Sequence, residues 1–122
     1  MGKVIRFELQ VPIIEQALDF YSKSFGWKFT KMPGQQEYYF IQTGEATDKG
    51  IDGGLMLSPD GQTRTTNSIN VTSIDEAIDK VINNGGNIVV PKTAIPQMGY
   101  FAYFIDNQGL LFGLSEENTN AQ

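Results

Sequence analysis

The residues that could do chemistry in this chain are few, because the sequence contains no histidine and no cysteine. Without histidine, the chain lacks the commonest general base near neutral pH and the commonest metal ligand. Without cysteine, it has no thiolate nucleophile and no disulfide. The best remaining candidate for proton transfer is Glu8, which alternates with Arg6 and Gln10 along one side of an extended run. We therefore take Glu8 as the candidate catalytic residue.

A sixty-residue repeat determines where these side chains must lie. Residues 66–90 align without a gap on residues 6–30, and a glycine (Gly26 or Gly86) follows the helical part of each copy. Each copy reads as an extended run, a short amphipathic helix, a glycine and a second extended run. A unit this short cannot bury its own apolar face, so we expect the two copies to share one core.

Alternating and helical spacings predict the same order of elements in both halves. The predicted strands are 4–11, 27–31, 38–43 and 55–58, then 67–71, 87–90, 99–105 and 110–115. The first helix should bury a stripe made of Ile14, Ala17, Leu18, Tyr21 and Phe25. The second should begin at Ser73 as N-cap, with Glu76 at capping-box spacing. Residues 44–54 and 91–98 read as loops, and 116–122 as a polar, frayed tail.

Each half is thus a strand, a helix and three strands, which predicts an α+β fold. We expect one domain, residues 1–122, made of a βαβββ module over 3–58 and a second over 65–116. Their sheets should lie edge to edge as a curved mixed sheet around a cleft, with the helices on the outer face. Alternate strand residues face opposite sides, so about half of the aromatic residues should be core and the others could stack on a planar ligand. These are Trp27, Tyr38, Tyr39, Phe40, Tyr100, Phe101, Tyr103 and Phe104.

This pattern resembles the vicinal oxygen chelate superfamily, which contains glyoxalase I, bleomycin resistance proteins, fosfomycin resistance enzymes and extradiol dioxygenases. The resemblance covers almost the whole chain and is carried most specifically by residues 7–9, 17–21, 25–27, 50–56, 91–99 and 106–114. Enzymes of the superfamily hold a divalent metal on the cleft floor, with ligands from the first and last strands of each half. By register, the resemblance places those positions at Arg6, Met56, Thr66 and Gly113.

The four positions do not offer what a divalent metal needs. Arginine is a permanent cation, methionine sulfur is a soft ligand and glycine has no side chain. Threonine alone is a weak ligand, and no histidine exists elsewhere to replace the missing donors. We therefore expect no metal and no cofactor. This disfavours the glyoxalase, dioxygenase and metal-dependent fosfomycin-transferase chemistries that the resemblance would imply.

The leading interpretation is a metal-free protein, similar to glyoxalases and bleomycin resistance proteins, that binds a small organic molecule in the cleft. The predicted ligand-binding residues are Arg6, Glu8, Gln10, Met56, Thr66, Ser68 and Gly113, with Asn70 on the same face. In this interpretation Arg6 would hold a carboxylate or phosphate. An equally weighted interpretation is structural: Arg6 and Glu8 pair with nearby groups and fill space.

Other functions stay open from the sequence. One is a lyase or isomerase of the superfamily that uses Glu8 or a tyrosine for proton transfer. Another is a metalloenzyme with a rearranged all-oxygen site, for which Glu8 and Glu37 are the candidate ligands. A structural or partner-binding module is a further alternative.

The bulk composition argues against some classes of binding partner. The 122 residues carry a net charge of −5, which repels nucleic acid and anionic lipid. No apolar segment has the length of a signal sequence or a membrane span, so we expect a cytoplasmic location. The resemblance implies a homodimer, and the open edges of the two predicted sheets agree with this expectation.

Overall fold

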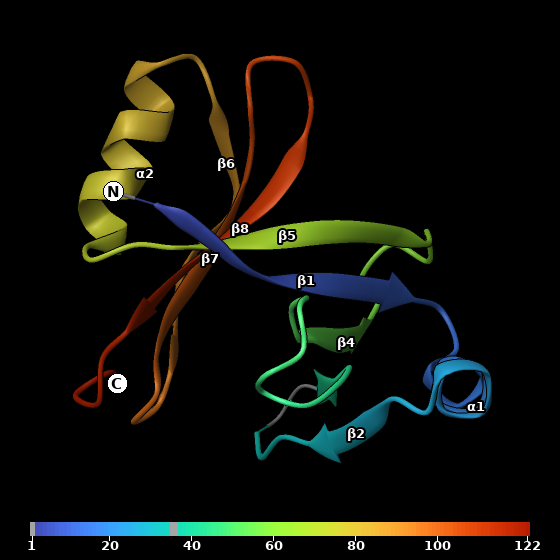
Figure 1. Cartoon of the computed structure of the whole chain (residues 1–122). Coiled ribbons are helices and arrows are strands. Elements are labelled where there is room, and N and C mark those ends of the chain that lie inside the picture. Colours follow the sequence, from blue (N-terminus) through green and yellow to red (C-terminus); the bar gives the residue numbers. More distant parts are fainter. Residues whose placement is uncertain (1, 35–36) are drawn as a thin grey trace. The chain divides into compact units, whose positions relative to one another are not determined.

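The computed structural model describes residues 2–34 and 37–122. Within them, two helices and eight strands follow one another as strand, helix and three strands, twice (Figure 1). The chain divides into two compact units: a first unit, Arg6–Thr66, and a second unit that joins Asn67–Gln122 to the start of the chain through Ile5. The predicted α+β class and the βαβββ order are confirmed.

The first unit contains one helix and a four-stranded mixed sheet. Its elements are β1 (Lys3–Val11), α1 (Ile14–Phe25), β2 (Lys28–Lys31), β3 (Tyr38–Gln42) and β4 (Gly53–Leu57). The strands are ordered β2-β3-β4-β1, with β1 parallel to β4 and antiparallel pairs elsewhere. Alternation along β1 turns Leu9 toward α1, so Glu8 and Gln10 face the opposite side of the sheet.

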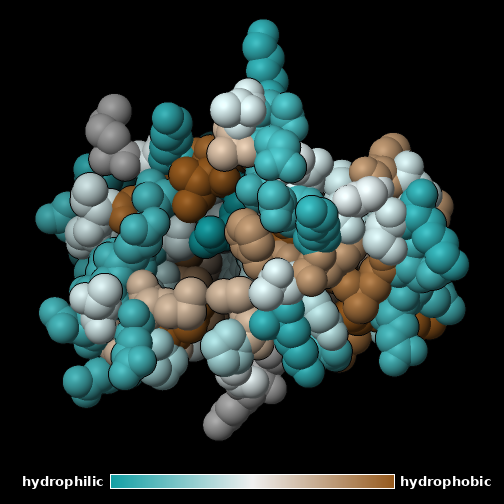
Figure 2. Space-filling view, turned by 60° about the horizontal axis from the view of Figure 1, so that its bottom comes forward, coloured by the Kyte–Doolittle hydropathy of each residue, from teal (hydrophilic) through white to brown (hydrophobic). Residues whose placement is uncertain are grey.

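Helix α1 packs on this sheet through its apolar stripe and ends where the sequence predicts. Gly26 adopts a left-handed conformation with φ of 71°, and its N–H donates to the Ser22 carbonyl at 2.9 Å. The predicted stripe is wrong at its last residue, because Phe25 is 65% exposed. The Phe25 ring instead contacts the ring of Trp27, with centroids 5.7 Å apart. Figure 2 shows other hydrophobic side chains, in brown, at the surface.

The second unit repeats this arrangement. Its elements are β5 (Arg64–Asn70, which begins in the first unit), α2 (Ile74–Asn83), β6 (Asn87–Ile95), β7 (Gly99–Ile105) and β8 (Leu111–Glu117). The strands are ordered β5-β8-β7-β6, with β5 parallel to β8. The predicted N-cap is confirmed, since the Ser73 hydroxyl accepts from the Glu76 N–H at 3.2 Å. Ile74, Ala102, Phe104 and Leu114 form the buried core under α2.

The first residues of the chain group with the second unit rather than with the first module predicted from residue 3. A Cβ on Gly2 would lie 2.6 Å from the Ile69 side chain and 3.5 Å from that of Val71. Because the backbone at Gly2 approaches these side chains so closely, a residue without a side chain suits this position. Neither helix among the described residues is long and apolar enough to cross a membrane.

Two predictions about the second half are wrong. Most of the stretch 91–98 is not a loop, because β6 continues through Pro91 to Ile95 with irregular register against β7, and only residues 96–98 form a turn. Proline is tolerated there since β6 is the outermost strand of its sheet and needs no donor on its outer side. The tail is not frayed either. Ala121 is 2% exposed, and its carbonyl accepts from the Gln97 N–H at 3.0 Å.

Candidate functional site

The candidate site in the first unit begins on the sheet face turned away from α1. Glu8 and Gln10 project from β1 onto this face and are only 6% and 3% exposed. The parallel register sets Glu8 beside Gly54 and Gln10 beside Met56 on β4. Three predicted ligand-binding residues, Glu8, Gln10 and Met56, therefore lie together. A buried carboxylate and a buried amide need partners, so their contacts decide what the face could bind.

Tyr38 is the partner of Glu8 that the sequence does not identify. Its hydroxyl donates to Glu8 Oε2 at 2.9 Å, from the neighbouring strand β3. The side chain passes over Gly54, where an added Cβ would overlap the hydroxyl group. Strand β4, which contains Gly54, starts at Gly53, two residues earlier than predicted. Its glycines allow close approach rather than a loop, because a Cβ on Gly53 would also lie within 2.6 Å of the Phe7 ring.

The environment of Tyr38 keeps its hydroxyl protonated. Burial, and next the charge of Glu8, raise the pKa of Tyr38 well above its ordinary value, whereas the charge of Arg6 opposes this shift. Tyr38 is thus a stable hydrogen-bond donor to the Glu8 carboxylate at neutral pH. Arg6, half-buried on β1, is close enough to Tyr38 to influence it electrostatically.

The raised pKa of Tyr38 predicts a loss of stability at high pH. In the unfolded chain this phenol releases its proton at about pH 10, whereas the folded chain still retains the proton at that pH. The contribution of Tyr38 is fully present below that pH and declines as pH rises toward the folded-state pKa. Urea denaturation from about pH 8 to about pH 11 should show a shallower decline for Tyr38→Phe than for wild type. Equal slopes for Tyr38→Phe and wild type would contradict the assignment.

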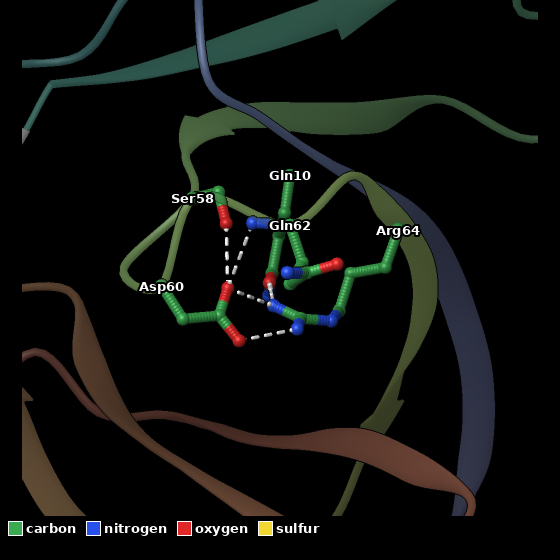
Figure 3. Close-up of polar contacts among 5 residues, drawn as sticks. All are labelled: Gln10, Ser58, Asp60, Gln62 and Arg64. Carbon is green, nitrogen blue, oxygen red and sulfur yellow. Dashed lines mark hydrogen bonds and ion pairs between the residues drawn. The ribbon is translucent and has the colours of Figure 1, made fainter.

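Gln10 is held by a polar network at the end of β1 (Figure 3). Arg64 Nη1 donates to Gln10 Oε1 at 2.7 Å, and Arg64 Nη2 donates to Asp60 Oδ2 at 2.6 Å. Asp60 Oδ1 also accepts from the Ser58 hydroxyl at 2.9 Å and from the Gln62 N–H at 3.1 Å. The hydrogen bond from Arg64, and then those from Gln62 and Ser58, hold the pKa of Asp60 well below its usual range. The network fixes the Gln10 amide, so Gln10 is a positioned group with its carbonyl already engaged.

The positions that the resemblance implies for metal ligands do not form a metal site in the first unit. Gln10, and not Arg6, is level with Met56 across the parallel pair. Arg6 is four residues back along β1, which corresponds to about 13 Å. A single ion could not reach side chains at both levels, and neither side chain is a suitable ligand for a hard divalent ion. The residues present therefore do not fit the metal of the superfamily.

Glu37 does not provide a rearranged carboxylate site with Glu8. Its Oε2 accepts from the Tyr39 hydroxyl at 3.4 Å, and Tyr39 packs against the core under α1. Tyr38 points to Glu8 on the other face, because consecutive strand residues face opposite sides. Within residues 2–34 and 37–122, no group of three or more carboxylates, histidines or cysteines is arranged to hold a metal ion.

The remaining predicted residues lie on β5 and β8. Thr66 and Ser68 are each 4% exposed and project to the same side of β5. Ser68 is in register with Gly113 of β8, which in turn pairs with Tyr103 of β7. In the second unit this row combines a hydroxyl, a position without a side chain and an aromatic ring. None of these three residues offers the imidazole or carboxylate that a divalent metal site needs.

Comparison with known proteins identifies the family. The model of the Glyoxalase/Bleomycin resistance protein/Dioxygenase superfamily matches residues 3–114. The chain belongs to this superfamily. A putative glyoxylase of Mycobacterium tuberculosis is 30% identical over 116 residues, which are 91% of this chain and 44% of the relative. The chain thus spans less than half the length of that glyoxalase-superfamily relative.

Solved structures share the fold of this chain. A hypothetical protein from Bacillus halodurans has a TM-score of 0.73 at 21% identity, covering 99% of this chain and 98% of that one. A methylmalonyl-CoA epimerase variant from Streptomyces coelicolor, in complex with 2-nitronate-propionyl-CoA, has a TM-score of 0.71 at 10% identity. The match covers 96% of this chain and 98% of the epimerase. At these identities the likeness concerns the fold alone.

Proposed function

We propose that this glyoxalase-superfamily chain binds a small organic molecule through polar side chains on the sheet faces turned away from its helices, without a metal. The observation that carries the proposal is the Glu8–Tyr38 pair. A carboxylate that is 6% exposed is held at 2.9 Å by a half-buried phenol, above a glycine that leaves room for that phenol. Oriented donors and acceptors on a buried surface are typical of small-molecule sites.

The chemistry of the donors supports binding without metal. A superfamily-type site needs imidazole or carboxylate ligands, whereas the corresponding positions here are Arg6, Met56, Thr66 and Gly113. Arg6 supplies a positive charge near the Glu8–Tyr38 pair, since its charge acts on Tyr38. We therefore expect the ligand to carry a carboxylate, phosphate or thioester oxygen that Arg6 can hold.

A thermal-shift screen tests the proposal. The panel comprises methylmalonyl-CoA, coenzyme A, bleomycin, fosfomycin and a set of hydroxy and keto acids, each measured with EDTA. The fold shared with an epimerase bound to a CoA ester is the reason to include the acyl-CoA. At least one compound should raise the melting temperature with EDTA present, and Arg6→Gln should abolish the rise. No rise from any compound, or a rise only after a divalent metal is added, would overturn the proposal.

A second function, acid–base catalysis by Glu8, is favoured by one specific contact. Tyr38 keeps its proton and donates a hydrogen bond to Glu8 Oε2, which orients the Glu8 carboxylate on this face of the sheet. A carboxylate oriented in this way could remove a proton next to a carbonyl, as an isomerase or lyase requires. Tyr38 would then act as a positioning residue.

Deuterium exchange distinguishes this enzyme from a binding protein. If Glu8 is the base, a ligand found in the screen should exchange its acidic C–H for C–D in D₂O. Glu8→Gln should lower the exchange rate by about 10²–10⁴-fold while the ligand still raises the melting temperature. Exchange that is unaffected by Glu8→Gln would remove Glu8 from this role.

We also propose that the chain forms a homodimer. Strands β2 and β6 are the outermost strands of their sheets, so each has a backbone edge open to a partner strand. On α1, the apolar side chains of Phe20 and Phe25 are 57% and 65% exposed. Light scattering after size exclusion should give twice the mass of the chain, and a monomer at all concentrations would refute the proposal. A cytoplasmic location stays a prediction from the sequence.

A further inference from the structure

We propose that the second unit has its own subsite, in which Asn70 and Ser115 bind the carboxamide edge of a ligand whose planar part lies against Phe101. The inference deepens the proposed function, on which it rests, because it names a chemical group that the second unit would recognise. None of the residues predicted from the resemblance to bind ligand is needed for it. All three side chains belong to the second unit.

The register places the three side chains in one row. Asn70 on β5 pairs with Ser115 on β8, and Ser115 pairs with Phe101 on β7. Paired residues on neighbouring strands lie about 5 Å apart and project to the same side. Their sequence neighbours Ile69 and Leu114 pack in the core under α2, so this row faces the opposite side of the sheet.

Asn70 and Ser115 each have a buried polar atom that lacks a partner. Among the described residues, nothing forms a hydrogen bond with Asn70 Oδ1 or Ser115 Oγ, although both atoms are buried. The side chain of Ser115 alone is unsatisfied, since its backbone carbonyl accepts from the Val71 N–H at 2.8 Å. A buried polar atom without a partner destabilises the folded chain, and two of them in register indicate a shared occupant.

The chemistry of the two atoms defines the occupant. A carbonyl oxygen only accepts, so Asn70 Oδ1 requires an N–H or O–H donor. The Ser115 hydroxyl can donate, so it can satisfy an acceptor placed beside that donor. A carboxamide presents an N–H and a C=O side by side and fits both atoms. A carboxylate has no hydrogen to donate, and its charge would face the Asn70 oxygen.

Aromatic rings next to the row favour a planar ligand. Phe101 and Tyr103 alternate along β7 on this face, with ring centroids 6.0 Å apart and planes at 71°. Both side chains are half-buried, so part of each ring remains open to a neighbour. A flat apolar body can pack on such a ring while its polar edge reaches the strand beside it. Benzamide combines these two features in a minimal probe.

Nuclear magnetic resonance of the ¹⁵N-labelled full chain tests the subsite with benzamide and methyl benzoate. Benzamide should shift the amide signals of Asn70, Phe101 and Ser115, whereas methyl benzoate, which has a carbonyl but no N–H, should not. Asn70→Ala and Ser115→Ala should each weaken benzamide binding about tenfold, or about 1.4 kcal/mol. Asn67→Ala, an exposed asparagine on the same strand, should leave binding unchanged.

The melting temperature of Ser115→Ala without ligand is a second test of the subsite, which does not depend on the binding measurement. Ser115→Ala removes an unsatisfied group, so the melting temperature of the free protein should stay level or rise. A fall of several degrees would show that the hydroxyl already has a partner, and would overturn the inference. It also fails if benzamide gives no shifts at these residues, as expected if the row holds a structural water only, or if both probes give the same shifts. These outcomes do not depend on Arg6 or Glu8, so they are separable from failure of the proposed function.

Discussion

Replacing Leu55 by alanine is expected to lower the free energy of unfolding by about 2–5 kcal/mol. Leu55 is fully buried in β4 and packs in the first-unit core with Leu9, Ile41 and two residues of α1. Truncation removes buried apolar surface and leaves a cavity. The cavity cannot close easily, because β4 is hydrogen-bonded to β3 on one side and β1 on the other. Urea denaturation followed by the fluorescence of Trp27, which stacks on Tyr21 at 4.9 Å, measures the change within the first unit.

A matched control lies two residues away on the same strand. Leu57 is 50% exposed, so Leu57→Ala changes the same side chain without opening a buried cavity. Its effect should stay within about 0.5 kcal/mol, as for most surface substitutions. Equal effects of the two substitutions would contradict the assignment of Leu55 to the core.

Replacing Ile74 by alanine should destabilise the second unit by a similar amount, about 2–5 kcal/mol. Ile74 is the first residue of α2 and is fully buried against Ala102, Phe104 and Leu114. Its backbone N–H also donates to Glu116 Oε1 at 2.8 Å, which fixes the start of the helix on β8. The control is Ile82→Ala, on the same helix but 53% exposed, which should change stability little. Circular dichroism measures both variants.

Together these variants test whether residues 1–122 form one cooperative domain, as the duplication predicts. If they do, Trp27 fluorescence in the first unit should report the full destabilisation caused by Ile74→Ala in the second. If Trp27 fluorescence in Ile74→Ala reports the same urea midpoint as in wild type, the two units fold separately. That result would contradict the expectation that neither copy is stable without the other.

Local patterns predict most of the fold because they depend on neighbouring residues. The spacing of apolar residues identifies both helices, and Gly26 and Ser73 end and begin them as capping chemistry requires. The sixty-residue repeat then gives the order of elements. The errors arise where tertiary structure overrides a local signal. Pro91 reads as a loop but lies in an outermost strand, and the polar tail is held by the loop before β7.

The candidate site is less predictable, because it depends on which strands pair and in what register. The alternation along β1 correctly places Glu8 and Gln10 on one face. It cannot show that Tyr38 rather than Tyr39 reaches Glu8, since either phase of β3 is compatible with the sequence. Two adjacent glycines in β4 were the available signal, because glycine within a strand indicates close approach of another group.

The partners of Gln10 show the same limitation. Arg64 is 54 residues away in the sequence and is aligned by the Asp60 turn, so no local pattern joins it to Gln10. The register likewise decides that Gln10, and not Arg6, is level with Met56. Positions inferred from a family resemblance thus need the strand pairing before they can be read as one site.

The metal content of the protein tests most directly whether the chain lacks the superfamily's metal site. The full chain would be dialysed against Mn²⁺, Zn²⁺ and Ni²⁺ in turn, passed through a desalting column and analysed for elements. Since no set of suitable donors occupies the superfamily positions, we predict less than about one-tenth of an ion per chain for each metal. One firmly retained ion per chain, lost on substitution of Glu8, would contradict the account.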